Sequence, residues 1–200
     1  MIRAFVPIKR LDVAKSRLAA ALNPVDRRNF VNETARHVCR IVEQSVDEIS
    51  IVTPYPIQEL QGFHQAIVRE PGLNRSLRFA ISKVEHLPGD RTVVILADLP
   101  FLETSDIASV VSGAADEFVI APDLSGTGTN CVAFPATRRP GLFFGANSRE
   151  RFERFAVRRG KRTLLVKKFG LGFDVDDATS YSDYQSIVSK RESMHEQPPC

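Results

Sequence analysis

The sequence predicts an α/β fold, a three-layer sandwich around a mixed, mostly parallel sheet. Apolar runs typical of strands alternate with helical patterns along the chain, and this alternation favours parallel strands joined by helices. Residues 92–97 are almost continuously apolar, as in a strand covered on both faces. The 200 residues show no internal linker, so we expect one domain over residues 1–190. Residues 191–200 are polar with two prolines, and we expect a flexible tail there.

Local patterns predict each element in turn. The first strand covers residues 2–6, and Asn23-Pro24 then carries the N-cap and first-turn signature of a helix. This order predicts a right-handed βαβ start. The remaining strands are expected at 48–53, 66–69, 92–97, 118–120, 131–134 and 163–166, and the remaining helices after Pro71-Gly72, at 104–111, from Asn147-Ser148 to Gly160, and near Thr179-Ser180.

Composition excludes several classes of protein. The net charge of +3 comes from 27 basic and 24 acidic residues, which is too balanced for a nucleic-acid-binding surface. No apolar stretch is long enough to span a membrane. Cys39, Cys131 and Cys200 lack metal-ligand spacing, and no leader peptide is evident, so we expect a cytoplasmic protein without zinc. The oligomeric state, including a homo-oligomer, stays open.

Carboxylates follow a predicted strand and a later predicted turn. Asp98 comes directly after the 92–97 strand, and Pro100 prevents that strand from continuing, so Asp98 should lie at the carboxyl edge of the sheet, where open α/β folds bind ligands. After a turn at 170–172, an alternating strand end would point Asp174 and Asp176 to one side. Such oxygens suit Mg²⁺ shared with ligand phosphates. The alternatives are that Asp98 caps a turn and that Asp176 and Asp177 start the last helix.

A basic segment follows the first strand. It carries Lys9, Lys15 and Arg17 and contains no glycine, so it cannot wrap a phosphate with backbone amides as a Walker motif does. Its side chains would have to supply the positive charge instead. A solvated basic loop is about as compatible with charge alone.

Three further segments suit an anionic ligand. Residues 126–130 combine glycines, hydroxyls and exposed amides, although tight turns use the same residues. Residues 144–148 place a glycine before a helix, whose free amides attract anions, although a simple helix cap needs only Asn147 or Ser148. In the segment 70–74, the Glu70 carboxylate can accept hydrogen bonds from guanine.

These motifs, in this order, resemble the 2-phospho-L-lactate guanylyltransferase family, including its phosphoenolpyruvate-using members, which act in coenzyme F-420 biosynthesis. The matching segments are 6–9, 14–18, 70–74, 97–100, 121–123, 126–130, Phe144-Gly145 with Ser148, and 171–176. The resemblance implies a nucleotide-diphospho-sugar transferase-like, Rossmann-like fold, and transfer of GMP from GTP, with Mg²⁺, to a phosphorylated three-carbon acid. Phosphoenolpyruvate, 2-phospho-L-lactate and 3-phospho-D-glycerate stay open as acceptors.

The resemblance also implies roles for individual residues. We expect the catalytic residues to be Lys9, Lys15, Arg17 and Asp98. The nucleotide should be bound by the same three cations together with Glu70, Gly72 and Asn74, and the acceptor by Thr129, Gly145 and Ser148. The metal should be held by Asp98 with Asp174 or Asp176. Two positions depart from the family pattern: Phe152 replaces a common histidine, and 177–180 replaces Thr-Pro-Glu-Asp. The alternative functions are a metal-dependent nucleotide-sugar glycosyltransferase and a non-catalytic nucleotide sensor.

Overall fold

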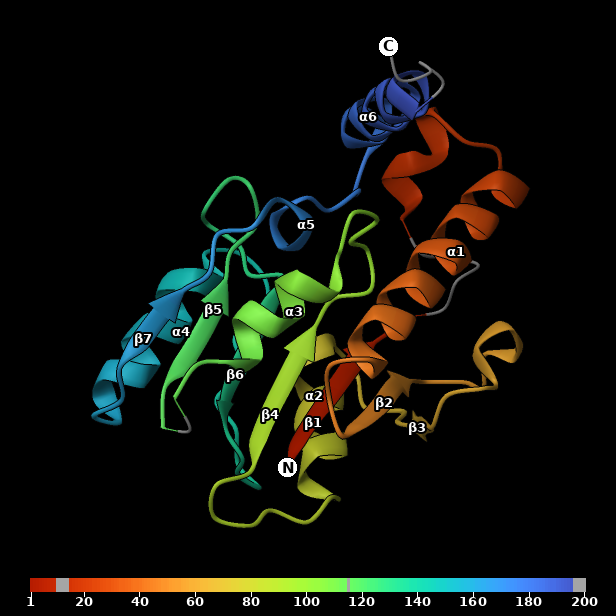
Figure 1. Cartoon of the computed structure of the whole chain (residues 1–200). Helices are drawn as coiled ribbons and strands as arrows, with labels where there is room; N and C mark the ends of the chain where they lie inside the picture. The colour runs from red at the N-terminus through yellow and green to blue at the C-terminus, as the bar shows by residue number, and fades with distance from the viewer. Residues whose placement is uncertain (10–14, 115, 196–200) are drawn as a thin grey trace.

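The computed structural model describes residues 1–9, 15–114 and 116–195 (Figure 1). Its sheet has seven strands in the order β3-β2-β1-β4-β6-β5-β7. Strand β6 runs antiparallel to β4 and β5, and the other neighbours are parallel. The strands are β1 (Ile2–Pro7), β2 (Glu48–Thr53), β3 (Gln65–Ile67), β4 (Arg91–Ile95), β5 (Phe118–Ala121), β6 (Cys131–Pro135) and β7 (Thr163–Leu165). The mixed, mostly parallel sheet is as predicted.

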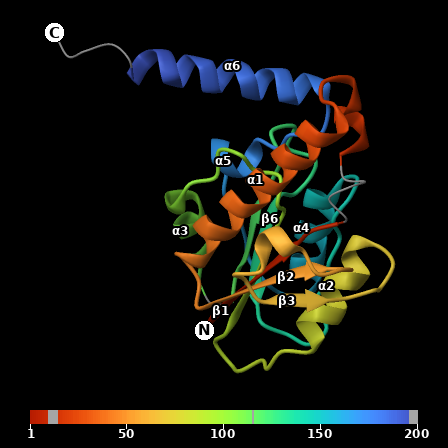
Figure 2. The same cartoon turned by 90° about the vertical axis from the view of Figure 1, so that its right-hand side faces the viewer.

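Helices cover both faces of this sheet and make three layers (Figure 2). Helices α1 (Pro24–Glu43) and α3 (Thr104–Val111) pack on one face, and α2 (Leu73–Ser82) and α4 (Ser148–Arg158) pack on the other. Buried side chains of β4 alternate between the two cores, with Val93 and Ile95 on the α1 side and Val94 on the α2 side. The remaining helices are η1 (Ser16–Ala20), η2 (Gln58–Leu60), α5 (Phe169–Gly172) and α6 (Ala178–His195).

The predicted caps explain where helix α1 begins. The Asn23 side chain accepts hydrogen bonds from the backbone amides of Val25 and Asp26, each at 3.0 Å, and Pro24 occupies the first helical turn. These contacts satisfy amides that have no partner inside the helix. A local sequence signal thus sets where α1 begins.

Several predicted boundaries differ from the structure. Strand β3 starts one residue earlier than expected and ends at Ile67, and β4 ends at Ile95. The expected turn at 170–172 is the short helix α5, and the segment 173–177 is not a strand. The expected tail begins inside α6, which continues to His195. Residues 196–200 lie outside the described part.

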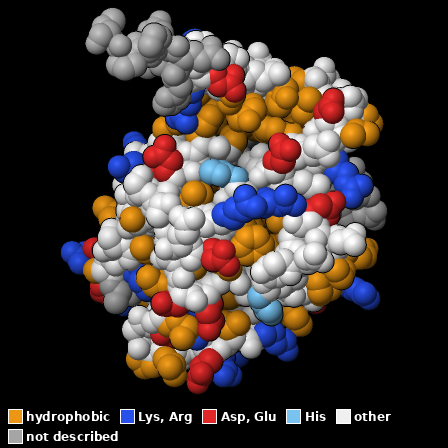
Figure 3. Space-filling model, turned by 45° about the vertical axis from the view of Figure 1, so that its right-hand side comes forward, with side chains coloured by type: hydrophobic (Ala, Val, Ile, Leu, Met, Phe, Trp, Pro, Cys, Tyr) orange, Lys and Arg blue, Asp and Glu red, His pale blue; other side chains and the backbone are white. Residues whose placement is uncertain are grey.

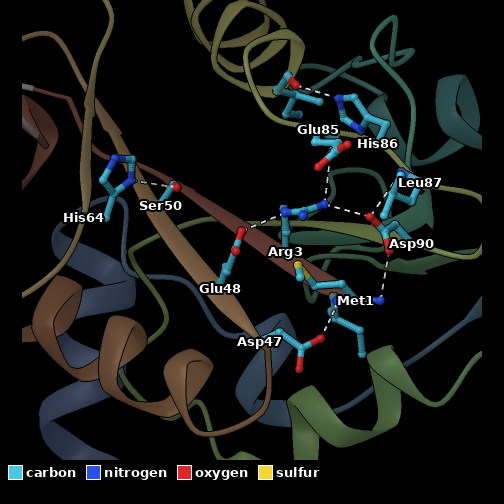
Figure 4. Close-up of polar contacts among 12 residues, drawn as sticks. Met1, Arg3, Asp47, Glu48, Ser50, His64, Glu85, His86, Leu87 and Asp90 are labelled. Carbon is cyan, nitrogen blue, oxygen red and sulfur yellow. Dashed lines mark hydrogen bonds and ion pairs between the residues drawn. The ribbon is translucent and has the colours of Figure 1, made fainter.

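The amino edge of the sheet, opposite the carboxyl ends of its parallel strands, is joined by ion pairs (Figure 4). Arg3 Nε donates to Glu48 at 2.7 Å, and Arg3 Nη1 donates to Asp90 at 2.8 Å. The amino group of Met1 lies 3.0 Å from the other oxygen of Asp90. This network connects β1 to β2 and to the start of β4.

The surface agrees with the balanced composition. On the face shown in Figure 3, acidic and basic side chains are interspersed instead of gathering by sign. Among the described residues, none of the helices has the length and apolarity that a membrane crossing needs.

Candidate functional site

Three carboxylates meet beyond the carboxyl end of β4. Asp98 follows this strand, and Asp174 and Asp176 lie between α5 and α6. One oxygen from each of the three lies within 4.8 Å of the other two. Asp174 and Asp176 therefore point to the same region, as expected, although the segment that carries them is irregular and not a strand end.

The structure shows that the three clustered carboxylates are not the residues that start helices α3 and α6. The N-cap position of α3 belongs to Glu103, so Asp98 does not cap that helix. At the start of α6, the backbone amide of Ser180 donates to Asp177 at 3.0 Å. Asp177 thus takes the helix-starting role that was an alternative for both Asp176 and Asp177, and Asp176 joins the acidic cluster.

Asn130 holds the segment that carries Asp174. Its side-chain amide donates to the carbonyl oxygens of Leu171 and Gly172, at 3.0 and 3.2 Å, and to Asp174 Oδ1 at 3.2 Å. Asn130 is only 3% exposed, and burial makes such hydrogen bonds costly to lose. The start of β6 thereby determines where one carboxylate of the cluster lies. The sequence places Asn130 in the polar segment 126–130, directly before a buried strand, but indicates no contact between it and Asp174.

The acidic cluster is electrostatically strained. Burial raises the pKa of Asp174 to about 6, and repulsion from Asp98 adds to this effect, while the hydrogen bond from Asn130 opposes it. One oxygen of Asp98, Oδ1, is buried without a hydrogen-bond partner among the described residues. A buried oxygen that lacks a donor, beside carboxylates that repel one another, is a suitable environment for a cation.

The three predicted cations lie in different places. The Lys15 ammonium donates to Asp98 Oδ2 at 2.5 Å and to Asp176 Oδ1. Burial opposes the charge of Lys15, but Asp98 and Asp176 outweigh it and raise the pKa of Lys15. Arg17, in η1, is exposed. Hydrogen bonds from Ser180 lower the pKa of Asp177, and the charge of Arg17 adds a smaller contribution. Residues 10–14 of the predicted basic loop lie outside the described residues.

Lys9 lines a separate cavity of about 270 Å³. Glu70 and Gly72, two further residues predicted to bind the nucleotide, line the same cavity, together with Pro7, Ile8, Val52, Pro54, Val68, Leu73 and Ser76. The cavity thus combines apolar walls with one carboxylate and one ammonium group, a composition suited to a flat polar ring. In the structure Glu70 pairs with Arg75 at 3.1 Å.

Asn74 connects this cavity to the predicted acceptor segment. Its side-chain nitrogen donates to the carbonyl oxygen of Phe144, and its side-chain oxygen accepts from the Phe144 amide, each at 2.9 Å. The pair of hydrogen bonds holds the chain just before Gly145, whose φ of +119° favours glycine. The Asn74 side chain therefore binds protein backbone in this structure.

Thr129 and Ser148 both have buried hydroxyls without a hydrogen-bond partner among the described residues. Thr129 is 4% exposed and Ser148 is 1% exposed. The Arg149 amide donates to the Thr127 carbonyl at 3.2 Å, which brings the start of α4 beside the 126–130 loop. Buried polar groups are normally paired, so these two hydroxyls point to a ligand.

Asp123 folds the glycine-containing loop itself. One of its oxygens accepts from the amides of Thr127 and Gly128, each at 3.0 Å. A Cβ atom at Gly128 would lie 2.6 Å from the other oxygen, so this glycine is needed for the close approach. Amides that Asp123 already engages are not free for a ligand, which the sequence alone did not reveal.

Phe152 belongs to the core. It is fully buried and packs edge-on against Phe143 and Phe144, with ring centroids 5.5 and 5.3 Å apart. The Phe152 side chain therefore supports the 143–144 segment through ring packing.

Comparisons with known proteins show which proteins this chain is similar to. Phosphoenolpyruvate guanylyltransferase from Chloroflexus aurantiacus is 31% identical over 198 residues, covering 94% of this chain and 97% of that protein. The 2-phospho-L-lactate guanylyltransferase from Methanopyrus kandleri is 27% identical over 192 residues, covering 96% and 94%. A structure from Desulfovibrio desulfuricans, described as a nucleotide-diphospho-sugar transferase, superposes with a TM-score of 0.69 at 13% identity, covering 88% and 82%, and shows the same fold.

The family model described as guanylyl transferase, CofC like, matches residues 2–193. This match includes every segment that carries a candidate site residue. The chain therefore belongs to the CofC-like family of guanylyl transferases.

Proposed function

We propose that the protein transfers GMP from GTP to a phosphorylated three-carbon acid and releases pyrophosphate. The observation that carries this proposal is the convergence of Asp98, Asp174 and Asp176 beyond the carboxyl end of β4. In a member of a guanylyl transferase family, such a cluster suits a metal ion that binds nucleotide phosphates.

The three carboxylates fit Mg²⁺. Their oxygens are hard ligands, Asp98 Oδ1 is buried without a partner among the described residues, and a single described ammonium group, that of Lys15, pairs with the cluster. Asp98 would be one ligand, and Asp174 or Asp176 the second. When bound, the ion would neutralise charge on the phosphates of GTP.

The remaining residues divide by substrate. Lys9, Glu70 and Gly72 would surround the guanine base, with Glu70 released from Arg75 to accept hydrogen bonds from the ring. Lys15 and Arg17 would bind the phosphates. Thr129, Gly145 and Ser148 would bind the acceptor, because two of them offer buried, unpaired hydroxyls. Asn74 would act on the nucleotide indirectly, through the backbone of Phe144 that it holds.

The reaction needs no general base. An oxygen of the acceptor phosphate forms a bond to the α-phosphorus of GTP, and the bond from that phosphorus to the bridging oxygen breaks, so pyrophosphate leaves with both electrons. A phosphate monoester has its second pKa near ~6 and is already largely a dianion at neutral pH. The enzyme therefore has to align two anions and reduce their repulsion.

We place phosphoenolpyruvate first among the acceptors. The Chloroflexus aurantiacus relative named for this acid is 31% identical, against 27% for the Methanopyrus kandleri relative named for 2-phospho-L-lactate; 3-phospho-D-glycerate is the third candidate. The corresponding role is a step of coenzyme F-420 biosynthesis in the cytoplasm. Family membership does not favour a glycosyltransferase or a non-catalytic sensor.

The test is pyrophosphate release from GTP and Mg²⁺ with each of the three acids in turn. We expect release to require one acid, and to stop when EDTA removes the metal. Release at the same rate without any acid would refute transfer to an acceptor. Sugar transfer from a nucleotide sugar would instead support the glycosyltransferase alternative.

A further inference from the structure

Lys15 lies where the proposed metal would bind. Its ammonium group contacts Asp98 and Asp176, two of the three carboxylates in the cluster, and its side chain is only 16% exposed. These contacts join residues 83 and 161 positions apart in the chain. Without a metal ion, Lys15 therefore supplies the positive charge that the carboxylates need.

The backbone of Lys15 shows that this position is held against a cost. Its φ of 55° and ψ of 47° are left-handed, and Asn147 is the other described residue besides glycines with a positive φ. A residue with a Cβ adopts this conformation only at an energetic cost. The two ion pairs are among the interactions that offset this cost.

An ammonium group and a divalent cation compete for these carboxylates. One oxygen from each of the three lies within 4.8 Å of the other two, so a Mg²⁺ ion among them and the Lys15 nitrogen would repel each other at close range. Metal binding is therefore favoured when the ammonium leaves the cluster. Phosphate oxygens of a bound nucleotide are suitable new partners for it.

We propose that Lys15 exchanges partners during binding, holding the carboxylates in the metal-free protein and the phosphates of GTP once the metal has bound. This inference rests on the proposed function, because it assumes the metal and the nucleotide. It makes Lys15 an internal competitor of the metal as well as a phosphate-binding residue. A metal ion without nucleotide should consequently bind weakly.

The first experiment measures Mn²⁺ binding by electron paramagnetic resonance, with no nucleotide present. We expect Lys15→Met to bind Mn²⁺ at least about tenfold more tightly than the wild type, because the competing ammonium is gone. Lys83→Met is the matched control, since Lys83 lies over the Phe79 ring, 4.9 Å from its centroid, and is not the described lysine that pairs with the cluster. Its Mn²⁺ affinity should equal that of the wild type.

The outcomes separate this inference from the proposed function. Equal or weaker Mn²⁺ binding by Lys15→Met, with clear binding by the wild type, would overturn the exchange and leave the metal site intact. Absence of Mn²⁺ binding by both proteins, with and without GTP, would overturn the metal site itself. The rise in melting temperature caused by Mn²⁺ provides a second measure on the same proteins and reports whether Lys15→Met is folded.

A labelling experiment follows the ammonium directly. The Lys15 amine of the wild-type protein is modified with an acylating reagent and quantified by mass spectrometry. We expect Mg²⁺ alone to raise the labelling rate several-fold, and Mg²⁺ with α,β-methylene-GTP to lower it again, while Lys83 labelling stays constant. Labelling of Lys15 that does not respond to Mg²⁺ at a concentration that saturates the site would overturn the exchange.

Discussion

Ser148 is the residue whose environment most directly suggests contact with a substrate. Its side chain is buried, its hydroxyl has no partner among the described residues, and its amide bonds to the Gly145 carbonyl at 3.1 Å. The hydroxyl is therefore not used to cap α4. A hydrogen bond from it to an anionic group would contribute about 1.5–3 kcal/mol.

We predict that Ser148→Ala weakens use of the acceptor by roughly one to two powers of ten, since each ~1.4 kcal/mol is tenfold. The loss should appear in the Michaelis constant for the acid or in kcat/KM, while the dissociation constant for GTP, measured by calorimetry, stays within a few-fold. Ser109→Ala is the control, because the Ser109 hydroxyl donates within its own helix, to the Ser105 carbonyl. Weakened GTP binding with unchanged acceptor dependence would assign Ser148 to the other substrate.

Asp98 is the second residue for which one substitution separates fold from function. Asn has nearly the volume of Asp but lacks the charge that a metal ligand supplies. We predict that Asp98→Asn lowers kcat by roughly a thousandfold, a barrier increase of about 4 kcal/mol, while the melting temperature changes by only a few degrees. Asp183→Asn, exposed on α6, should behave as wild type. Near-normal turnover at saturating Mg²⁺ would show that Asp98 is not a ligand.

At the scale of elements, helix α6 contacts every chain segment that carries the acidic cluster and Lys15, through one hydrophobic cluster. That cluster contains Leu18, Phe101, Phe173 and Val175, with Phe30, Tyr181, Tyr184, Ile187 and Val188 packed against it. Leu18 is three residues from Lys15, Phe101 is three residues from Asp98, and Phe173 and Val175 flank Asp174. The order of the site thus depends on apolar packing outside it.

Tyr184 tests this dependence. Its ring lies 5.1 Å from Phe30 and 5.5 Å from Phe101, between centroids. We predict that Tyr184→Ala destabilises the protein by about 1–3 kcal/mol and also lowers kcat well below the melting temperature, because the Asp98 segment loses support. Tyr184→Phe keeps the ring and should restore both properties. Destabilisation with an unchanged kcat would limit α6 to a purely structural role.

At the scale of the whole molecule, the carboxyl and amino edges of the sheet, where its parallel strands end and begin, carry different arrangements of charge. The carboxyl edge gathers like charges that repel, whereas the amino edge pairs opposite charges around Asp90. The amino group of Met1, then the Leu87 amide and Arg3, lower the pKa of Asp90 to about 2, although its burial acts in the opposite direction. The stabilising edge thus lies opposite the edge that we propose for catalysis.

The lowered pKa of Asp90 determines how the stability of the protein should change with pH. A carboxyl group with a native pKa below its unfolded value of about 3.9 stabilises the fold above that pH, and this contribution disappears as the pH falls toward 2. We predict that Asp90→Asn lowers the urea midpoint at pH 7, and that the difference from wild type shrinks between pH 4 and pH 2. Asp183→Asn should show no such trend. A difference that is constant with pH would mean that hydrogen-bond geometry matters, and not the charge.

Much of the fold follows from local sequence patterns. Helix α3 and strand β2 have the predicted bounds, and α1 begins at the predicted cap, because apolar period and capping act over a few residues. The end of α6 is not predicted from the sequence, since no local signal ends the helix at the polar segment that starts with Arg191. Strand β3, with three residues, is also too short for its pattern to fix its ends.

Local sequence patterns predict the succession of strands and helices, the position of Asp98 after a buried strand, and the segments that carry polar and charged groups. Tertiary packing brings Asp98 to Asp174 and Asp176 and places Lys15 between two of these carboxylates. It also pairs Asn74 with backbone and leaves the hydroxyls of Thr129 and Ser148 without described partners. The physical reason is distance along the chain. Caps and apolar periods depend on neighbouring residues, whereas burial, pairing and repulsion depend on segments that packing alone brings together.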